Sequence, residues 1–284
     1  MDLAFMDETI GKVLIEFKEN PYGVRHRLSF FASCLKNYFQ ESSKIPSVLE
    51  VGCGTGELIS IPLAKMGFPV VGIDIHEPSI QRGRQMAAKY GVRNVTLYSK
   101  SIDELLLMRS EFDVVICSEV LERLDNPASM LKKIARITKP SGIALITVPN
   151  GYGPFETASR LYDIYFRFLR PFIKQLKSRL REFMSHHSQS MNFTKQYEPY
   201  SSGGTLNLES RHIQFFSWGN INALFESTGW RVELYVGRCF LCGPFLDLVV
   251  NALPSGEDWN VMLGNRLPPL MVSGWMFQLR KSID

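Results

Sequence analysis

Apolar and polar positions along the chain follow two repeating patterns, one typical of buried strands and one typical of helices. Short runs rich in Val, Ile and Leu recur between residues 48 and 148. Most are followed by a stretch with apolar residues three or four positions apart. Runs that are apolar at nearly every position are typical of parallel strands covered on both faces. The pattern predicts a doubly wound α/β sheet, whose first five strands we expect at 48–51, 69–74, 94–98, 112–117 and 142–148.

Helical periodicity also flanks this central part of the chain. We expect two helices before the first strand, at 9–17 and 25–39, and they form an N-terminal cap over residues 1–44. Residues 45–284 form the main domain, which contains an aromatic, helical insertion at 154–212 after the fifth strand. The remaining elements are predicted as a helix at 217–228, a strand at 230–236, a helix at 244–253 and a last strand at 272–279.

A glycine-rich turn follows the first strand. Gly52, Gly54 and Gly56 stand at alternate positions, where they permit positive φ and let a ligand approach the backbone. This spacing is not that of the dinucleotide fingerprint, because Glu57 occupies the position of its third glycine. A P-loop is excluded too, since no Gly-Lys-Ser/Thr follows. Glu50 and Glu57 flank the turn, and two carboxylates suit a ligand with an ammonium group better than a phosphate.

The second strand ends in an acidic residue, Asp74. It lies 22 positions after Gly52, close to the interval at which an acidic residue accepts from ribose hydroxyls. The alternative is that Asp74 caps the next helix, but His76 and the residues after it already begin that helix. We therefore interpret Asp74 as the ribose-binding residue and place Ile75 against the adenine face.

Taken together, these segments resemble a known family. The Glu50-x-Gly-x-Gly-x-Gly turn, the Asp74 strand end and the Glu-Val-Leu-Glu segment at 119–122 occur in the order of the class I S-adenosylmethionine-dependent methyltransferases. The resemblance covers about 45–150. Within that class, the sequence is similar to small-molecule O-methyltransferases of the ubiquinone-biosynthesis type and to related uncharacterised bacterial methyltransferases.

The resemblance implies a fold and a cofactor. The fold is a Rossmann-like, seven-stranded sheet of order 3-2-1-4-5-7-6 with the last strand antiparallel. The cofactor is S-adenosylmethionine, and the product is S-adenosylhomocysteine. It further implies donor contacts from Cys53 in the turn, from Ser118 after the fourth strand, and from Ser101, Ile102 and Asp103, which edge the adenine. Asp103 has an alternative role, as the cap of the short helix that follows.

Methyl transfer from a sulfonium requires alignment and a dry pocket, and it requires a base only for a hydroxyl or a protonated amine. Where the family's Glu-Val-Leu-Glu segment continues with histidine, this chain has Arg123, whose guanidinium cannot accept a proton. His212 is the best candidate for a general base, although a packing role for it stays open. Glu119 is a second candidate catalytic side chain, and no metal-ligand cluster stands out.

Composition narrows the function classes. The chain has 284 residues, 45% of them hydrophobic and 21% charged, which is typical of a globular protein. An odd number of cysteines, no signal peptide and no apolar run long enough for a membrane span favour a cytoplasmic protein. We interpret the Cys239-x-x-Cys242 pair as small buried residues. A NAD-dependent oxidoreductase is a third, weaker function class.

The net charge of +4 is unevenly distributed, because segment 157–187 carries seven Lys or Arg and two Asp or Glu and is therefore +5. The preferred interpretation is an enzyme that methylates a small-molecule or lipid-linked acceptor, with a hydroxyl oxygen as the expected site of methylation. In this interpretation the basic segment is a lid. The alternative is a methyltransferase-fold protein whose basic segment binds a membrane surface or RNA. We expect no specific nucleic acid, and the oligomeric state stays open.

Overall fold

The computed structural model describes residues 3–16, 23–153, 212–240, 250 and 256–282. Its strands are β1 (Val48–Val51), β2 (Val70–Asp74), β3 (Val95–Ser99), β4 (Phe112–Ser118), β5 (Thr138–Pro149), β6 (Trp230–Gly237) and β7 (Gly274–Lys281). They form one sheet in the order β3-β2-β1-β4-β5-β7-β6. The first five strands pair in parallel, and β7 is antiparallel to β5 and β6. The predicted strand order and the reversed last strand are confirmed.

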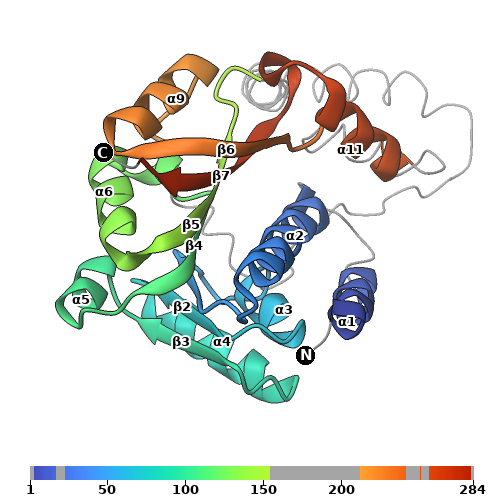
Figure 1. Ribbon diagram of the computed structural model, residues 1–284, viewed down its shortest axis with the longest axis vertical. Coiled ribbons are helices and arrows are strands. Elements are labelled where there is room, and N and C mark those ends of the chain that lie inside the picture. The colour runs from blue at the N-terminus through green and yellow to red at the C-terminus, as the bar shows by residue number, and fades with distance from the viewer. Residues whose placement is uncertain (1–2, 17–22, 154–211, 241–249, 251–255, 283–284) are drawn as a thin grey trace, which may run out of the picture.

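Helices cover both faces of this sheet. They are α1 (Leu3–Glu16), α2 (Val24–Ser42), α3 (Ser60–Lys65), α4 (Glu77–Lys89), α5 (Ile102–Leu107), α6 (Pro127–Ile137), α9 (Trp218–Ser227) and α11 (Gly256–Arg266), with 3-10 turns η2 (Leu121–Arg123) and η4 (Pro269–Met271). Figure 1 shows α5, α6 and α9 along one side of the sheet and α1, α2 and α3 along the other. In the described part of the chain, no helix is both long and apolar enough to cross a membrane.

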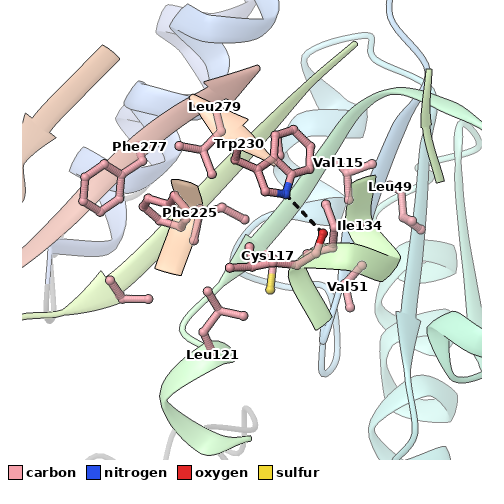
Figure 2. Close-up of a cluster of buried hydrophobic side chains, with 14 of the residues drawn as sticks. Leu49, Val51, Val115, Cys117, Leu121, Ile134, Phe225, Trp230, Phe277 and Leu279 are labelled. Atoms are coloured by element: carbon pink, nitrogen blue, oxygen red, sulfur yellow. Dashed lines mark hydrogen bonds between the residues drawn. The ribbon is translucent and has the colours of Figure 1, made fainter. Parts of the chain in front are cut away.

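Strand side chains alternate between two apolar cores, as the pleat of a strand requires. Leu49 and Val51 point into the core under α5, α6 and α9, whereas Val48 belongs to the core under α1, α2 and α3. Figure 2 shows the first of these cores, in which the indole Nε1 of Trp230 donates to the carbonyl oxygen of Leu131 at 3.1 Å. That bond satisfies the polar atom of a large buried ring.

The N-terminal cap packs as its helical periodicity predicts. Leu28, Phe31 and Leu35 lie on one face of α2 and are fully buried against the sheet. Arg27 lies one position before Leu28 and is also buried, which no apolar period predicts. α2 therefore brings a cation, as well as an apolar face, to the sheet.

Several predicted boundaries differ from the structure. β5 begins four residues before the predicted 142–148 strand, because Thr138 already pairs with Phe112 across a register shift in β4. α11 is a helix where the sequence suggested only a connection into the last strand. The insertion and the basic segment predicted at 154–212 lie outside the described residues except for their last residue, as does almost all of the predicted helix at 244–253.

Candidate active site

The candidate site lies at the carboxyl edge of the parallel strands. The turns after β1, β2, β3 and β4 all leave the sheet at this edge, which is where open α/β sheets bind ligands. β6 also ends here, because it runs antiparallel to β7 and β7 runs antiparallel to β5. Residues from five separate regions of the sequence therefore meet at one place.

The glycine turn after β1 needs its glycines. Gly52, Gly54 and Gly56 have φ of +74°, +56° and +69°, a region that side chains with a Cβ rarely adopt. A Cβ on Gly52 would lie 2.5 Å from Cγ2 of Val120, a residue of the segment after β4. The turn thus passes so close to the neighbouring loop that only a backbone without a side chain fits there.

Asp74 braces this turn. Its Oδ2 accepts from the backbone N–H of Gly54 at 2.8 Å, and its Oδ1 accepts from the backbone N–H of His76 at 2.8 Å. The N-cap position of α4 belongs to His76, so Asp74 is not the helix cap. Beside it, Ile75 is 83% exposed, a position that suits contact with a flat ligand face. The structure brings Asp74, Ile75 and the glycine turn together.

Glu50 and Cys53 support the turn from below. The Glu50 side chain is buried, and the hydroxyl of Ser60 at the start of α3 donates to its carboxyl group. Burial raises the pKa of Glu50 to about 7. The Cys53 thiol is also buried, and burial raises its pKa as well. These side chains therefore fix the shape of the turn, whereas the sequence suggested that Glu50 suits an ammonium group of the ligand.

The three residues predicted to edge the adenine, Ser101, Ile102 and Asp103, have different roles in the structure. Ser101 is the N-cap of α5, and it forms a capping box with Glu104 in which each side chain accepts from the other's backbone N–H. The alternative role of Asp103 as this cap is therefore wrong, and its carboxylate pairs instead with Lys133 at 2.7 Å. Ile102 is buried in the core under α5. At residues 101–103, therefore, only the backbone and the exposed surface can contact a ligand.

Glu119 joins three distant parts of the chain at the end of β4. Its Oε2 is 2.9 Å from Nη1 of Arg238 at the end of β6, and its Oε1 is 4.0 Å from Nη1 of Arg27 in α2. Arg27 Nη1 also donates to the Ser118 hydroxyl at 3.2 Å, and Thr147 donates to Glu119 Oε1 at 3.1 Å.

Although burial alone would raise it, the charges of Arg238 and Arg27 hold the pKa of Glu119 at about 2. The carboxylate is therefore ionised at neutral pH and is a poor base. Its place in the structure is that of an anchor between the cap, β4 and β6, not that of a proton acceptor.

Glu122 and His212 come together nearby. Glu122 lies in η2, and its backbone carbonyl accepts from the N–H groups of Ile213 and Gln214, both at 2.9 Å. These bonds fasten the segment that contains His212 across the end of β4. His212 is half-buried, and its charge acts on the Glu122 carboxyl. The predicted base thus lies at the carboxyl edge beside an acidic side chain.

Sequence reasoning missed the parts of the site that depend on contacts across the sheet. Arg238 follows β6 directly, and a charged residue at the carboxyl end of a strand is the one signal that points to it. No apolar period of the predicted cap helix points to Arg27, yet its side chain is only 7% exposed. Among the described residues, no group of three or more His, Cys, Asp or Glu side chains is arranged to hold a metal ion.

The fold and this edge define a class of protein. A sheet of this order with a glycine turn after β1, an acidic residue at the end of β2 and a reversed β7 is the Rossmann-like arrangement of class I S-adenosylmethionine-dependent methyltransferases. The site also passes a simple test of fit. Gly52 is exposed and Gly54 is half-buried, so this part of the turn leaves backbone open to a ligand, and a carboxylate and an exposed apolar side chain follow on the neighbouring strand.

Comparison with known proteins agrees with that class. Residues 42–228 match the model of a methyltransferase domain family, so the chain belongs to that family. Over 138 residues it is 34% identical to a ubiquinone biosynthesis O-methyltransferase of Rickettsia canadensis, an alignment that spans 47% of this chain and 57% of the relative. The corresponding protein of Rickettsia felis is 33% identical over 138 residues, 47% of this chain and 55% of its own. The chain thus spans little more than half of these curated relatives.

A solved structure supports the fold alone. The structure of PKMT2 from Rickettsia typhi has a TM-score of 0.51 and 14% sequence identity, and the match covers 83% of this chain and 49% of that one. The protein is therefore a class I S-adenosylmethionine-dependent methyltransferase by family and by fold.

Proposed function

We propose that the protein transfers a methyl group from S-adenosylmethionine to a hydroxyl oxygen of a small-molecule or lipid-linked acceptor. The observation that carries the donor half is the glycine turn, exposed at Gly52 and half-buried at Gly54, with Asp74 bound to it. The acceptor half is supported by the curated relatives, whose names state O-methylation in ubiquinone biosynthesis.

The residues that would hold the donor lie along the carboxyl edge. The backbone of Gly52–Gly56 faces the amino-acid part, and Asp74 accepts from the ribose hydroxyls, for which a carboxylate has two acceptor atoms. Ile75 packs against the adenine, and the backbone at 101–103 edges it. Arg27 supplies a buried cation at this edge that suits a carboxylate of the donor.

The chain's own part in the reaction is alignment and removal of a proton. When bound, S-adenosylmethionine supplies an electrophilic methyl group on a sulfonium, whose C–S bonding electrons return to sulfur as the acceptor oxygen forms its bond to carbon. A hydroxyl must lose its proton during this attack, and a neutral imidazole can take it near neutral pH. We therefore assign His212 as the general base. Glu119 is assigned a structural role, since two guanidinium groups keep it ionised.

A methylation screen tests this function. The purified protein is incubated with S-adenosylmethionine and matched series of phenols, catechols, alcohols, amines and thiols, each with and without a hydrocarbon tail. Formation of S-adenosylhomocysteine is then measured, with Asp74→Ala as the control for donor binding. We expect turnover with hydroxyl acceptors. Turnover with amines or thiols but not hydroxyls would overturn the acceptor assignment, and binding of NAD without S-adenosylhomocysteine would overturn the donor.

A further inference from the structure

Glu122 is a buried acid that lacks the hydrogen bonds such a group ordinarily has. Its side chain is 0% exposed, and neither carboxyl oxygen has a hydrogen-bond partner among the described residues. The adjacent Arg123 comes within 3.5 Å through Nε, but that N–H donates to the backbone carbonyl of Glu119 at 3.2 Å. Burial of a carboxyl without a partner costs free energy, so its presence at the carboxyl edge calls for a partner supplied there.

The segment 212–217 lies directly against this acid. It crosses η2 through two backbone bonds to the Glu122 carbonyl, and the side chain of Gln214 donates to the Leu124 carbonyl at 3.2 Å. At its other end, the carbonyl of Phe216 accepts from the N–H of Gly151 at 3.0 Å. The segment is thus held on both sides of the edge, and His212 is fixed immediately before the residues bonded to Glu122.

We propose that Glu122 is a positioning residue whose carboxyl group orients the His212 imidazole and stabilises its protonated form. This inference rests on the proposed function, in which His212 is the general base. The reactive pair is an ionised carboxylate beside a neutral imidazole. The acceptor O–H bond breaks as its proton passes to the imidazole nitrogen, and the oxygen lone pair forms the bond to the methyl carbon. The pair then holds one negative and one positive charge, so the buried carboxylate has gained a counter-charge.

The charges around the pair agree with this arrangement. Burial, and after it the negative charge of Glu119, raises the pKa of Glu122, whereas its own backbone N–H and then the charges of His212 and Arg123 lower it. The thiol of Cys117 in β4 also faces Glu122 and stays protonated, because burial raises its pKa. The pKa of Glu122 is therefore raised toward the range in which imidazoles titrate, so its protonation is coupled to that of His212.

The test follows the imidazole directly and needs no acceptor. The protein is labelled with ¹³C-histidine, and the five histidine signals are followed by NMR as pH changes. Loss of one signal in His212→Ala identifies His212. In Glu122→Gln we expect the His212 midpoint to fall by about one pH unit or more, because an opposite charge close to an imidazole favours its protonated form. Glu226→Gln, the same change at an exposed position of α9, is the matched control and should leave the midpoint in place.

Turnover supplies the second measurement. We expect E122Q to lower kcat by between about 10-fold and 10⁴-fold, the upper figure being the loss for the equivalent carboxylate-to-amide change in a serine protease triad. The affinity for S-adenosylhomocysteine should be unchanged, and E122D should recover part of the rate. The double variant E122Q/H212A should be no slower than H212A alone. An unchanged His212 midpoint in E122Q, or additive losses in the double variant, would overturn the proposal.

The two proposals fail in different ways. If the His212 midpoint moves in E122Q but no hydroxyl compound is methylated, the pairing stands and the proposed function fails. If hydroxyls are methylated and the midpoint does not move, only the pairing fails. Should E122Q not fold, difference infrared spectroscopy of the Glu122 carboxyl in wild type and H212A measures the same coupling, and an identical titration in both proteins rules it out.

Discussion

Replacement of Gly52 by Ala tests the donor site most directly. An alanine there must adopt φ near +74°, and its Cβ would lie 2.5 Å from Val120 Cγ2. The backbone conformation costs about 1–2 kcal/mol, and relief of the overlap costs about 1–3 kcal/mol more. We expect the free energy of unfolding to fall by about 2–5 kcal/mol. The affinity for S-adenosylhomocysteine should fall about tenfold or more, because relief of the overlap with Val120 displaces the turn backbone that the ligand would contact.

Gly91 provides a matched control for this experiment. It has φ +65°, and a Cβ there would meet nothing within 4 Å. G91A therefore bears only the conformational cost, about 1–2 kcal/mol, and should bind the ligand normally. V120A introduced into G52A removes the overlapping methyl groups and should recover stability relative to V120A alone. Urea unfolding and titration calorimetry measure both quantities. Equal losses in G52A and G91A, or no recovery on adding V120A, would refute the reasoning.

Three further predictions concern charged and titratable side chains. Asp74→Ala should weaken S-adenosylhomocysteine binding by about 1.5–3 kcal/mol, measured by calorimetry. The same loss for an analogue without ribose hydroxyls would mean that Asp74 only braces Gly54. His212→Ala should lower kcat by roughly 10²–10⁴-fold with donor affinity preserved, and a wild-type rate would make His212 structural. Burial raises the pKa of Glu50 from 4.5 to about 7, so between these values the folded state binds more protons than the unfolded state. Wild-type stability should therefore fall by about 3 kcal/mol as pH rises through that window. Glu50→Gln should not show this fall in the free energy of unfolding. Parallel pH dependences of urea unfolding in wild type and the variant would contradict the prediction.

Much of the fold is predictable from local pattern. Strand positions such as Val48 and Leu49 are apolar on both faces, so they identify a covered parallel sheet without any long-range information. The glycine turn is predictable for a similar reason, because positive φ and close approach leave few other residue types at Gly52. The order of β6 and β7 came from the family resemblance, since periodicity does not record which edge a strand joins.

The interior of the site was less predictable, because its pairings join residues far apart in the chain. Glu119 meets Arg238 across 119 positions of sequence, and Glu122 meets the His212 segment across about 90. Local spacing contains no trace of such contacts. The adenine edge shows a different limit. Ser101 and Asp103 both have the chemistry of a helix cap, and a difference of two residues in where α5 starts decides between them.

The two glutamates of the Glu-Val-Leu-Glu segment show how one short motif divides into two roles. Glu119 and Glu122 are three positions apart and equally acidic in solution. Two guanidinium groups hold the first ionised, and its fixed negative charge then adds to burial in raising the pKa of the second. When their environments drive the pKa values of two nearby carboxyl groups apart, one group keeps a permanent charge and the other can exchange protons. The arginines therefore act on His212 indirectly. They hold Glu119 ionised, the charge of Glu119 adds to the rise in the pKa of Glu122, and in our proposal Glu122 orients the imidazole that accepts the proton.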